Sequence, residues 1–259
     1  MVTIPIDLEQ LQVFFLVLVR VAAILMSMPG FSGSSAPVPV KAGLVLAVSW
    51  AVFPALGPMV PIPADSLVLL GLAVAGEVLL GVAIGLTVQM IFAGVQIAGE
   101  LAGYQMGMAV ANVLDPDSSV QIPLLSQFFQ MFAILIFFSV NAHHWFVKAL
   151  VESFHLLPPL RFHVNASLMD LLVNAGGAIF VSGVRLGAPV IVVLLLTSLA
   201  FGLLARTVPQ MNVFVVAIPL KIAVGLFFMA MSLPYVSAVL QSLFFDNLRR
   251  LLVLLANGF

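Results

Sequence analysis

The sequence predicts an all-α protein embedded in a membrane. Hydrophobic residues make up 63% of the 259 residues, charged residues only 7%, and the mean hydropathy is +1.26. Soluble domains average roughly 45–50% apolar and 25% charged residues. Because about 20 apolar residues span a bilayer core as a helix, we searched for runs of that length and found five or six. We therefore expect a chain built of long, kinked hydrophobic helices and helical hairpins.

The first two apolar runs cover residues 11–28 and 42–60, and the Pro-, Gly- and Ser-rich stretch 29–41 separates them. Asp7 and Glu9 precede the first run, where a secretory signal would carry Lys or Arg. The first run is therefore expected to be retained as a membrane helix.

The later runs cover residues 67–95, 122–140, 171–205 and 213–240. Residues 67–95 and 171–205 are too long for one simple crossing, so a straight bundle is not expected. Pro189 and Pro219 predict broken helices beside charges in the last two runs. Such breaks are tolerated only inside protein or along a water-filled path. The stretch after Phe244 mixes charges with Leu and Phe, which predicts an amphipathic helix at the membrane surface.

Glycines recur at four-residue spacing in the third run and beyond it. They are Gly81 and Gly85, then Gly99, Gly103 and Gly107. Small residues on one helix face allow close approach of backbones in lipid. The stripes predict closely packed helices, and the sequence leaves open whether the neighbour belongs to this chain or to another subunit.

Four charged residues lie within or beside apolar runs: Arg20, Glu77, Arg185 and Lys221. A charge at this depth costs roughly 2.5–3.5 kcal/mol unless it is paired or hydrated. Glu77 shares a helix face with Gly81 and Gly85, and either Arg20 or Arg185 could be its partner. We interpret these charges as structural pairs or subunit contacts rather than a proton relay.

Catalytic and cofactor motifs are not found in the sequence. The chain has no cysteine, and its net charge of −1 gives no basic patch for nucleic acid. His143 and His144 are adjacent and therefore lie about 100° apart on a helix, which is unsuited to a shared metal. We expect no cofactor and no metal, and interpret both histidines as interfacial, beside Trp145.

Residues 205–226, ARTVPQMNVFVVAIPLKIAVGL, closely resemble the signature of the FliR family of flagellar type III export, which the SctT family of virulence secretion shares more loosely. Three further stretches agree in family order: residues 29–41, the run GEVLLGVAIG at 76–85, and residues 98–116, which end in VLDP. Together they cover most of the chain. The sequence IPLKI after PQMNVF favours the flagellar branch.

The resemblance implies a non-enzymatic, channel-forming subunit of the export gate in the bacterial inner membrane. Such a subunit assembles with FliP-like and FliQ-like subunits into a helical hetero-oligomer, receives FlhB, contacts lipid and passes unfolded polypeptides. Residues 1–170 would be the FliP-like part and residues 171–259 the FliQ-like hairpin with its tail. Part of the chain would lie above the bilayer plane on the periplasmic side.

The resemblance also implies two sites. A closure loop that plugs the channel would map onto residues 105–121, with Met106, Met108, Asn112, Leu114, Asp115, Pro116 and Asp117. The hairpin tip at residues 206–212 would contact FlhB through Arg206, Pro209, Gln210 and Asn212.

Three other functions of the chain are kept as alternatives to a flagellar export subunit. They are the homologous subunit of a virulence secretion system, a secondary transporter, and a membrane-embedded hydrolase that uses His143 or His144.

Overall fold

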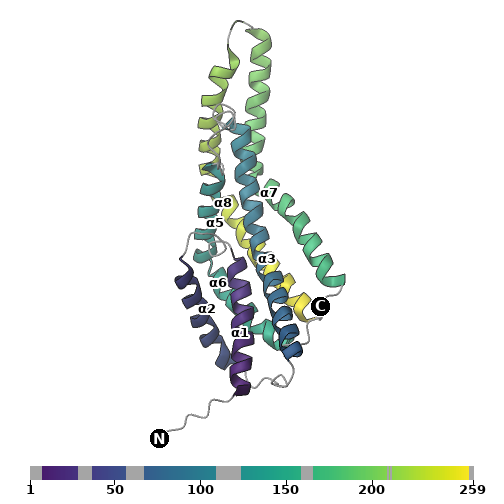
Figure 1. Cartoon of the computed structure of the whole chain (residues 1–259). Coiled ribbons are helices and arrows are strands. Elements are labelled where there is room, and N and C mark those ends of the chain that lie inside the picture. Colours follow the sequence, from purple (N-terminus) through teal and green to yellow (C-terminus); the bar gives the residue numbers. More distant parts are fainter. Residues whose placement is uncertain are drawn as a thin grey trace. The chain divides into compact units, whose positions relative to one another are not determined.

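The computed structural model describes residues 8–28, 37–56, 67–108, 124–158, 166–208, 210 and 212–256. Within these ranges the regular secondary structure is entirely helical, which confirms the predicted all-α class (Figure 1). The helices are α1 (Leu8–Ser27), α2 (Val38–Val52), the 3₁₀ helix η1 (Phe53–Leu56), α3 (Leu67–Met106), α5 (Leu124–Ser139), α6 (Ala142–Leu156), α7 (Ala166–Thr207) and α8 (Val213–Ala256).

Several of these helices are long and apolar enough to cross a membrane. Within the described ranges there are five such segments: Gln10–Ser27, Val38–Leu56, Leu67–Met106, Val173–Thr207 and Val215–Val253. Helices α3, α7 and α8 have 40, 42 and 44 residues. At about 1.5 Å per residue they are about 60–66 Å long, roughly twice a bilayer core. The prediction that the third and fifth runs exceed one simple crossing is confirmed.

The predicted breaks at the prolines are wrong, because Pro189 lies inside the continuous helix α7 and Pro219 and Pro234 lie inside α8. Proline has no backbone N–H and leaves the carbonyl four residues earlier without its helical donor. For Pro189 this carbonyl belongs to Arg185, and the Tyr235 hydroxyl donates a hydrogen bond to it at 3.2 Å. A side chain of the neighbouring helix thus replaces the missing donor, as membrane helices require.

Two further boundaries differ from the prediction. The helix α6 follows α5 after Val140 and Asn141, and Asn141 has a left-handed backbone with φ of 55°. His143 and His144 therefore lie in the first turn of a separate helix that the apolar runs did not predict. The tail after Phe244 is not a separate helix, because α8 continues through it to Ala256, and its position at the membrane surface stays a prediction.

The chain forms two compact units, each built from separated stretches of sequence. Unit 1 comprises Met1–Gln89, Asn141–Ala175 and Phe245–Phe259, and unit 2 comprises Met90–Val140 and Gly176–Phe244. Helices α3, α7 and α8 each contribute residues to both units. The division into residues 1–170 and 171–259, which rests on resemblance to other subunits, stays a prediction.

Unit 1 packs α1 against both α2 and the first half of α3. The ring of Phe14 on α1 meets Trp50 and Phe53 edge to face, with centroids 6.1 and 5.5 Å apart. The last turns of α8 also belong here, since the Asn247 amide donates to the Thr87 carbonyl at 2.6 Å. The aromatic contacts and this hydrogen bond fix helices that are far apart in the sequence.

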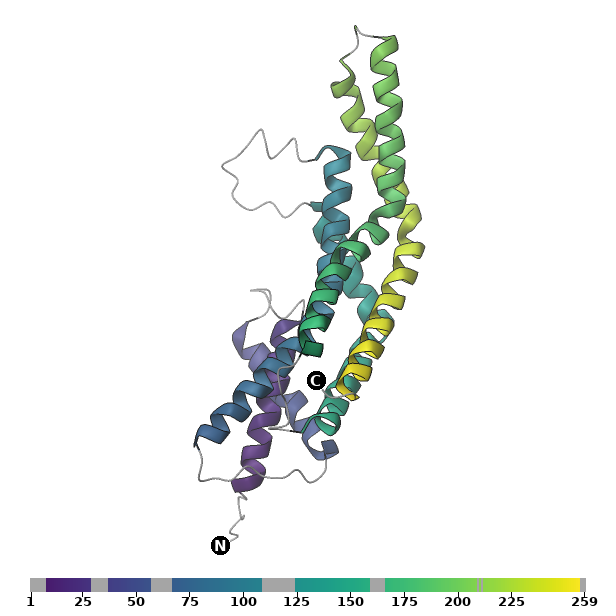
Figure 2. The ribbon, with the colours of Figure 1, turned by 90° about the vertical axis from the view of Figure 1, so that its right-hand side faces the viewer.

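Unit 2 contains the second half of α3, helix α5 and the parts of α7 and α8 at residues 176–207 and 213–244, which run side by side in the upper part of Figure 2 as a hairpin. Phe92, Phe137 and Phe244 form an aromatic cluster with centroid separations of 5.3–6.1 Å. Large apolar side chains on both hairpin helices remain exposed in the isolated chain, among them Leu195, Leu199, Leu203, Val215, Leu220 and Phe227. Lipid or other protein must cover such a surface.

Candidate functional site

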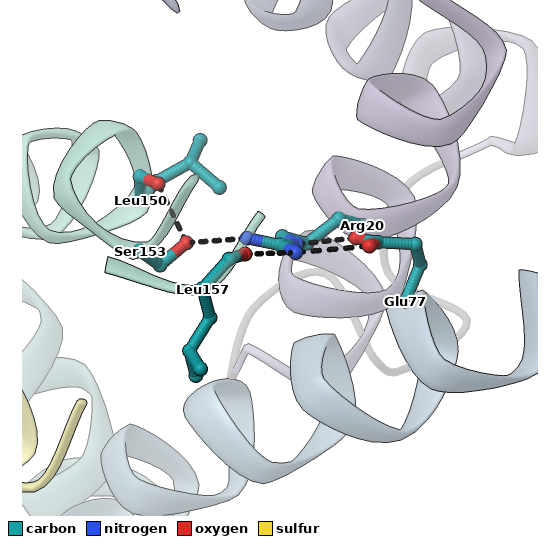
Figure 3. A network of polar contacts seen from close by, with 5 residues as sticks. All are labelled: Arg20, Glu77, Leu150, Ser153 and Leu157. Atoms are coloured by element: carbon teal, nitrogen blue, oxygen red, sulfur yellow. Dashed lines mark hydrogen bonds and ion pairs between the residues drawn. The ribbon is translucent and has the colours of Figure 1, made fainter. Parts of the chain in front are cut away.

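The strongest polar feature of the described chain is a buried network around Arg20 (Figure 3). Arg20 lies on α1 and is 1% exposed, and Glu77 lies on α3 and is 2% exposed. The guanidinium binds the carboxylate through two hydrogen bonds, Nε to Oε2 and Nη2 to Oε1, the second at 2.9 Å. This fork geometry is the strong form of an ion pair. Of the two partners that the sequence left open for Glu77, the structure shows Arg20.

Helix α6 contributes the other face of the network. The Arg20 Nη1 donates to Ser153 Oγ at 3.3 Å, and Nη2 donates to the Leu157 carbonyl at 2.9 Å. Ser153 itself donates to the Leu150 carbonyl at 2.7 Å, so a lone pair of its oxygen faces Arg20. Leu157 directly follows α6, where carbonyl groups make the helix end partly negative. Three helices therefore meet at one guanidinium.

The ring of Phe154 adds a third kind of contact, since the Arg20 Cζ lies 4.0 Å from its centroid. An arginine over an aromatic face gains energy when water is excluded, as it is here. The Arg20 guanidinium is therefore held away from solvent by contacts with Glu77, helix α6 and the Leu157 carbonyl that follows it. We interpret Arg20 and Glu77 as a structural pair, not a proton relay.

Two glycines of the predicted stripe allow α1 and α3 to approach each other beside this pair. A Cβ on Gly81 would lie 2.6 Å from Ala23 Cβ and 2.9 Å from the Arg20 carbonyl. A Cβ on Gly85 would lie 3.0 Å from the Ile24 carbonyl of α1. At these two positions the close neighbour belongs to the same chain. The stripe thus brings α1 and α3 close enough for the short Glu77 side chain to reach Arg20.

The second part of the stripe belongs to unit 2. A Cβ on Gly99 would lie 2.5 Å from the Cα of Ser126 on α5, and Gly103 is buried on the same helix. Gly107, however, lies just after α3 and has φ of 82°. Its N–H donates to the Tyr104 carbonyl and the Met108 N–H to the Gly103 carbonyl, which is the pattern of a glycine that ends a helix. Gly107 therefore ends the helix and does not continue the packing face.

The two remaining charges of the predicted buried set are not buried within the chain. Arg185 is exposed and Lys221 is half-buried, and neither forms an ion pair with any described residue. The description of both as buried is wrong for the isolated chain. Helix α7 turns the side chain of Arg185 outward, because Leu186 and Val190 take the inner face.

Part of the closure loop is described. Met106, the last residue of α3, is fully buried and packs against α8, since a Cβ on Gly225 would lie 2.9 Å from its Cγ. Met108 is half-buried. The remaining predicted residues, Asn112, Leu114, Asp115, Pro116 and Asp117, lie outside the described residues. The role of the loop stays a prediction.

The hairpin tip between α7 and α8 is polar and accessible. Arg206, Gln210 and Asn212 are exposed, and Pro209 lies outside the described residues. The side chains of Arg206, Gln210 and Asn212 are therefore accessible to another protein. Contact with FlhB stays a prediction.

His143 and His144 lie next to each other at the start of α6. The rings of His143 and His144 lie 4.2 Å apart, and no group of three or more possible metal ligands occurs in the part of the chain that the structure describes. The residues that sequence reasoning missed are Ser153 and the Leu157 carbonyl. Ser153 is one of many serines, and no sequence pattern marks a backbone carbonyl as a ligand.

Comparison with known proteins agrees with the motif resemblance. The family described as bacterial export proteins, family 1, matches residues 11–246. The chain is 38% identical to the flagellar biosynthetic protein FliR of Escherichia coli strain K12 over 237 residues, which are 92% of this chain and 90% of that protein. It is 33% identical to the protein of the same name from Bacillus subtilis strain 168 over 247 residues, 93% of this chain and 95% of that protein.

A more distant relative gives the same result. The flagellar biosynthetic protein FliR of Aquifex aeolicus strain VF5 is 29% identical over 227 residues, which cover 88% of this chain and 87% of that protein. The matches run through unit 1 and unit 2 alike, since residues 11–246 include helices from both. The chain therefore belongs to the FliR family of bacterial export proteins.

Proposed function

We propose that this chain is a membrane subunit of the bacterial flagellar type III export gate, in the inner membrane, and that it forms part of a channel for unfolded flagellar proteins without being an enzyme. The observation that carries the proposal is the family match over residues 11–246. The named relatives are flagellar biosynthetic proteins, and each is covered over most of its length. These names favour the flagellar branch over the virulence homologue.

The physical character of the chain supports a role within an assembly. Exposed apolar side chains extend along the α7–α8 hairpin, and its helices are about twice as long as a bilayer core. Apolar helix surface outside the bilayer needs protein neighbours, which FliP-like and FliQ-like subunits would provide. Pro189 and Pro219 do not interrupt α7 and α8, so these two prolines give no support to a secondary transporter, although α5 and α6 form a pair bent by 69°.

Two finer assignments belong to the proposal. The loop at residues 105–121 closes the resting channel, anchored at its first end by the buried Met106. The exposed tip residues Arg206, Gln210 and Asn212 contact FlhB on the cytoplasmic side. Unfolded polypeptide passes when the loop opens, and part of the chain lies above the bilayer plane on the periplasmic side.

Complementation tests the function. In a flagellated bacterium that lacks its own FliR-family protein, this chain is expected to restore swimming and to co-purify with the FliP-like and FliQ-like subunits. The vector without the gene is the control. Normal expression in the membrane with neither swimming nor co-purification would contradict the proposal.

The same strain tests the finer assignments. Deleting residues 110–119 is expected to leave the complex assembled but to let ions leak, as measured by membrane potential. Because the chain contains no cysteine, a Gln210→Cys variant carries one reactive thiol, which is expected to crosslink to FlhB. If the deletion variant leaks no more ions than the unchanged complex, the loop is only a connector. If the thiol is labelled from the periplasmic side alone, the cytoplasmic placement of the tip is wrong.

A further inference from the structure

We propose that Glu100, together with the amides of Gln96 and Gln130, forms a docking site for a basic side chain on a membrane helix of a neighbouring subunit. The site lies in unit 2, on α3 and α5. It rests on the proposed function only in that the partner is a co-assembled subunit of the export gate.

The three side chains form a hydrogen-bonded row. The Gln130 amide donates to Gln96 Oε1 at 3.3 Å, and the Gln96 amide donates to Glu100 Oε1 at 2.9 Å. The two donated bonds point in the same direction, toward the carboxylate. The Gln96 amide therefore favours negative charge at Glu100 and orients the carboxylate, and the Gln130 amide orients Gln96.

The close approach of α5 to α3 at Gly99 positions this row of side chains. Because Gly99 lacks a Cβ, Ser126 comes near enough to donate its hydroxyl to the Gln96 carbonyl at 3.2 Å. That contact fixes α5 against α3 with Gln130, one turn after Ser126, level with Gln96. The site is thus held by the helix packing and does not depend on a flexible loop.

The carboxylate has no cationic partner within the described chain. Glu100 is the one described acidic residue of unit 2, whose described basic residues are Arg185, Arg206 and Lys221. None of them forms an ion pair with Glu100. A carboxylate within a 40-residue apolar helix is costly without a partner, and one amide hydrogen bond offsets only part of that cost.

The surroundings indicate where the partner lies. Glu100, Gln96 and Gln130 are half-buried, so the row opens on the surface of unit 2. Tyr104, one turn further on α3, is 59% exposed, and Met131, beside Gln130, is 67% exposed. An acidic group with an apolar rim matches a Lys or Arg whose aliphatic stem crosses the rim and whose charged end reaches the carboxylate.

The test uses the complex with its FliP-like and FliQ-like partners. Glu100→Gln keeps the shape of the side chain and removes its charge, and we expect about tenfold less co-purified complex per amount of chain in the membrane. Glu100→Lys is expected to abolish assembly. Gln130→Leu, which removes only the orienting amide, is expected to reduce the yield about threefold. Asp246→Asn, at an exposed carboxylate of α8, is the matched control and is expected to leave the yield unchanged.

Selection for restored swimming in the Glu100→Lys strain identifies the partner. We expect Asp or Glu to replace a Lys or Arg on a membrane helix of another subunit. An undiminished complex with Glu100→Gln would show that lipid or water occupies the site and would overturn the inference while leaving the proposed function intact. If the Glu100→Gln chain is degraded even when it is expressed without its partners, or if all suppressors lie in this chain, Glu100 has a role within the chain. Either result would also overturn the inference. Failure of the unchanged chain to assemble would remove both proposals.

Discussion

Unit 1 encloses one pair of opposite charges within an apolar core, and unit 2 has no such pair among its described residues. In unit 1, Arg20 and Glu77 are enclosed together and every hydrogen bond that holds them comes from the same chain. In unit 2, Glu100, Arg185 and Lys221 are half-buried or exposed, and none forms an ion pair within the described chain. The difference shows that some charges within these apolar helices are paired on folding, whereas others stay accessible on the described chain.

The largest expected effect is removal of one charge from unit 1. Glu77→Ala strands Arg20 in a dry site, and the loss of stability is expected to be about 3–5 kcal/mol. Thermal unfolding of the purified chain in detergent measures it. Arg185→Ala in unit 2 is the matched control and is expected to stay within about 0.5 kcal/mol.

A double variant separates charge from packing at the same place. Arg20→Met with Glu77→Leu removes both charges and keeps apolar volume, and it is expected to recover most of the lost stability. Equal unfolding temperatures for Glu77→Ala and Arg185→Ala would remove the distinction between the two units.

A middle-sized effect is expected from the close helix contact in unit 2. Gly99→Ala places a Cβ 2.5 Å from the Cα of Ser126, so α3 and α5 must separate, at a cost of about 1–3 kcal/mol. Gly202→Ala is the control, because a Cβ there has no neighbouring atom within 4 Å. If both variants unfold at the same temperature, the glycine contact does not hold unit 2 together.

The smallest effect is expected at the edge of the unit 1 network. Ser153→Ala removes one acceptor from Arg20, which keeps Glu77 and the Leu157 carbonyl. The expected loss is about 1 kcal/mol, also measured by thermal unfolding. A loss as large as that of Glu77→Ala would make Ser153 the main partner and contradict the description of the pair.

Helix α6 is an element that the hydropathy of the sequence did not predict. Residues 142–156 carry His143, His144, Lys148, Glu152 and His155 among apolar residues, so they form no continuous apolar run. Their buried face, which includes Phe146, Leu150 and Phe154, becomes visible only when the helix is placed against its neighbours. The breaks predicted at Pro189 and Pro219 failed for a similar reason. At Pro189, the hydroxyl of Tyr235, 46 residues later in the sequence, donates to the unpaired Arg185 carbonyl.

Composition and run length alone determined that this chain is helical and lies in a membrane, since an apolar chain must satisfy its backbone polar groups within helices in lipid. They also determined that Arg20 and Glu77 need partners. Only the tertiary structure decided that these two residues, 57 positions apart, meet each other and the end of α6. The periodicity of a sequence records which face of a helix is small, apolar or charged, but it carries no record of which helix lies opposite.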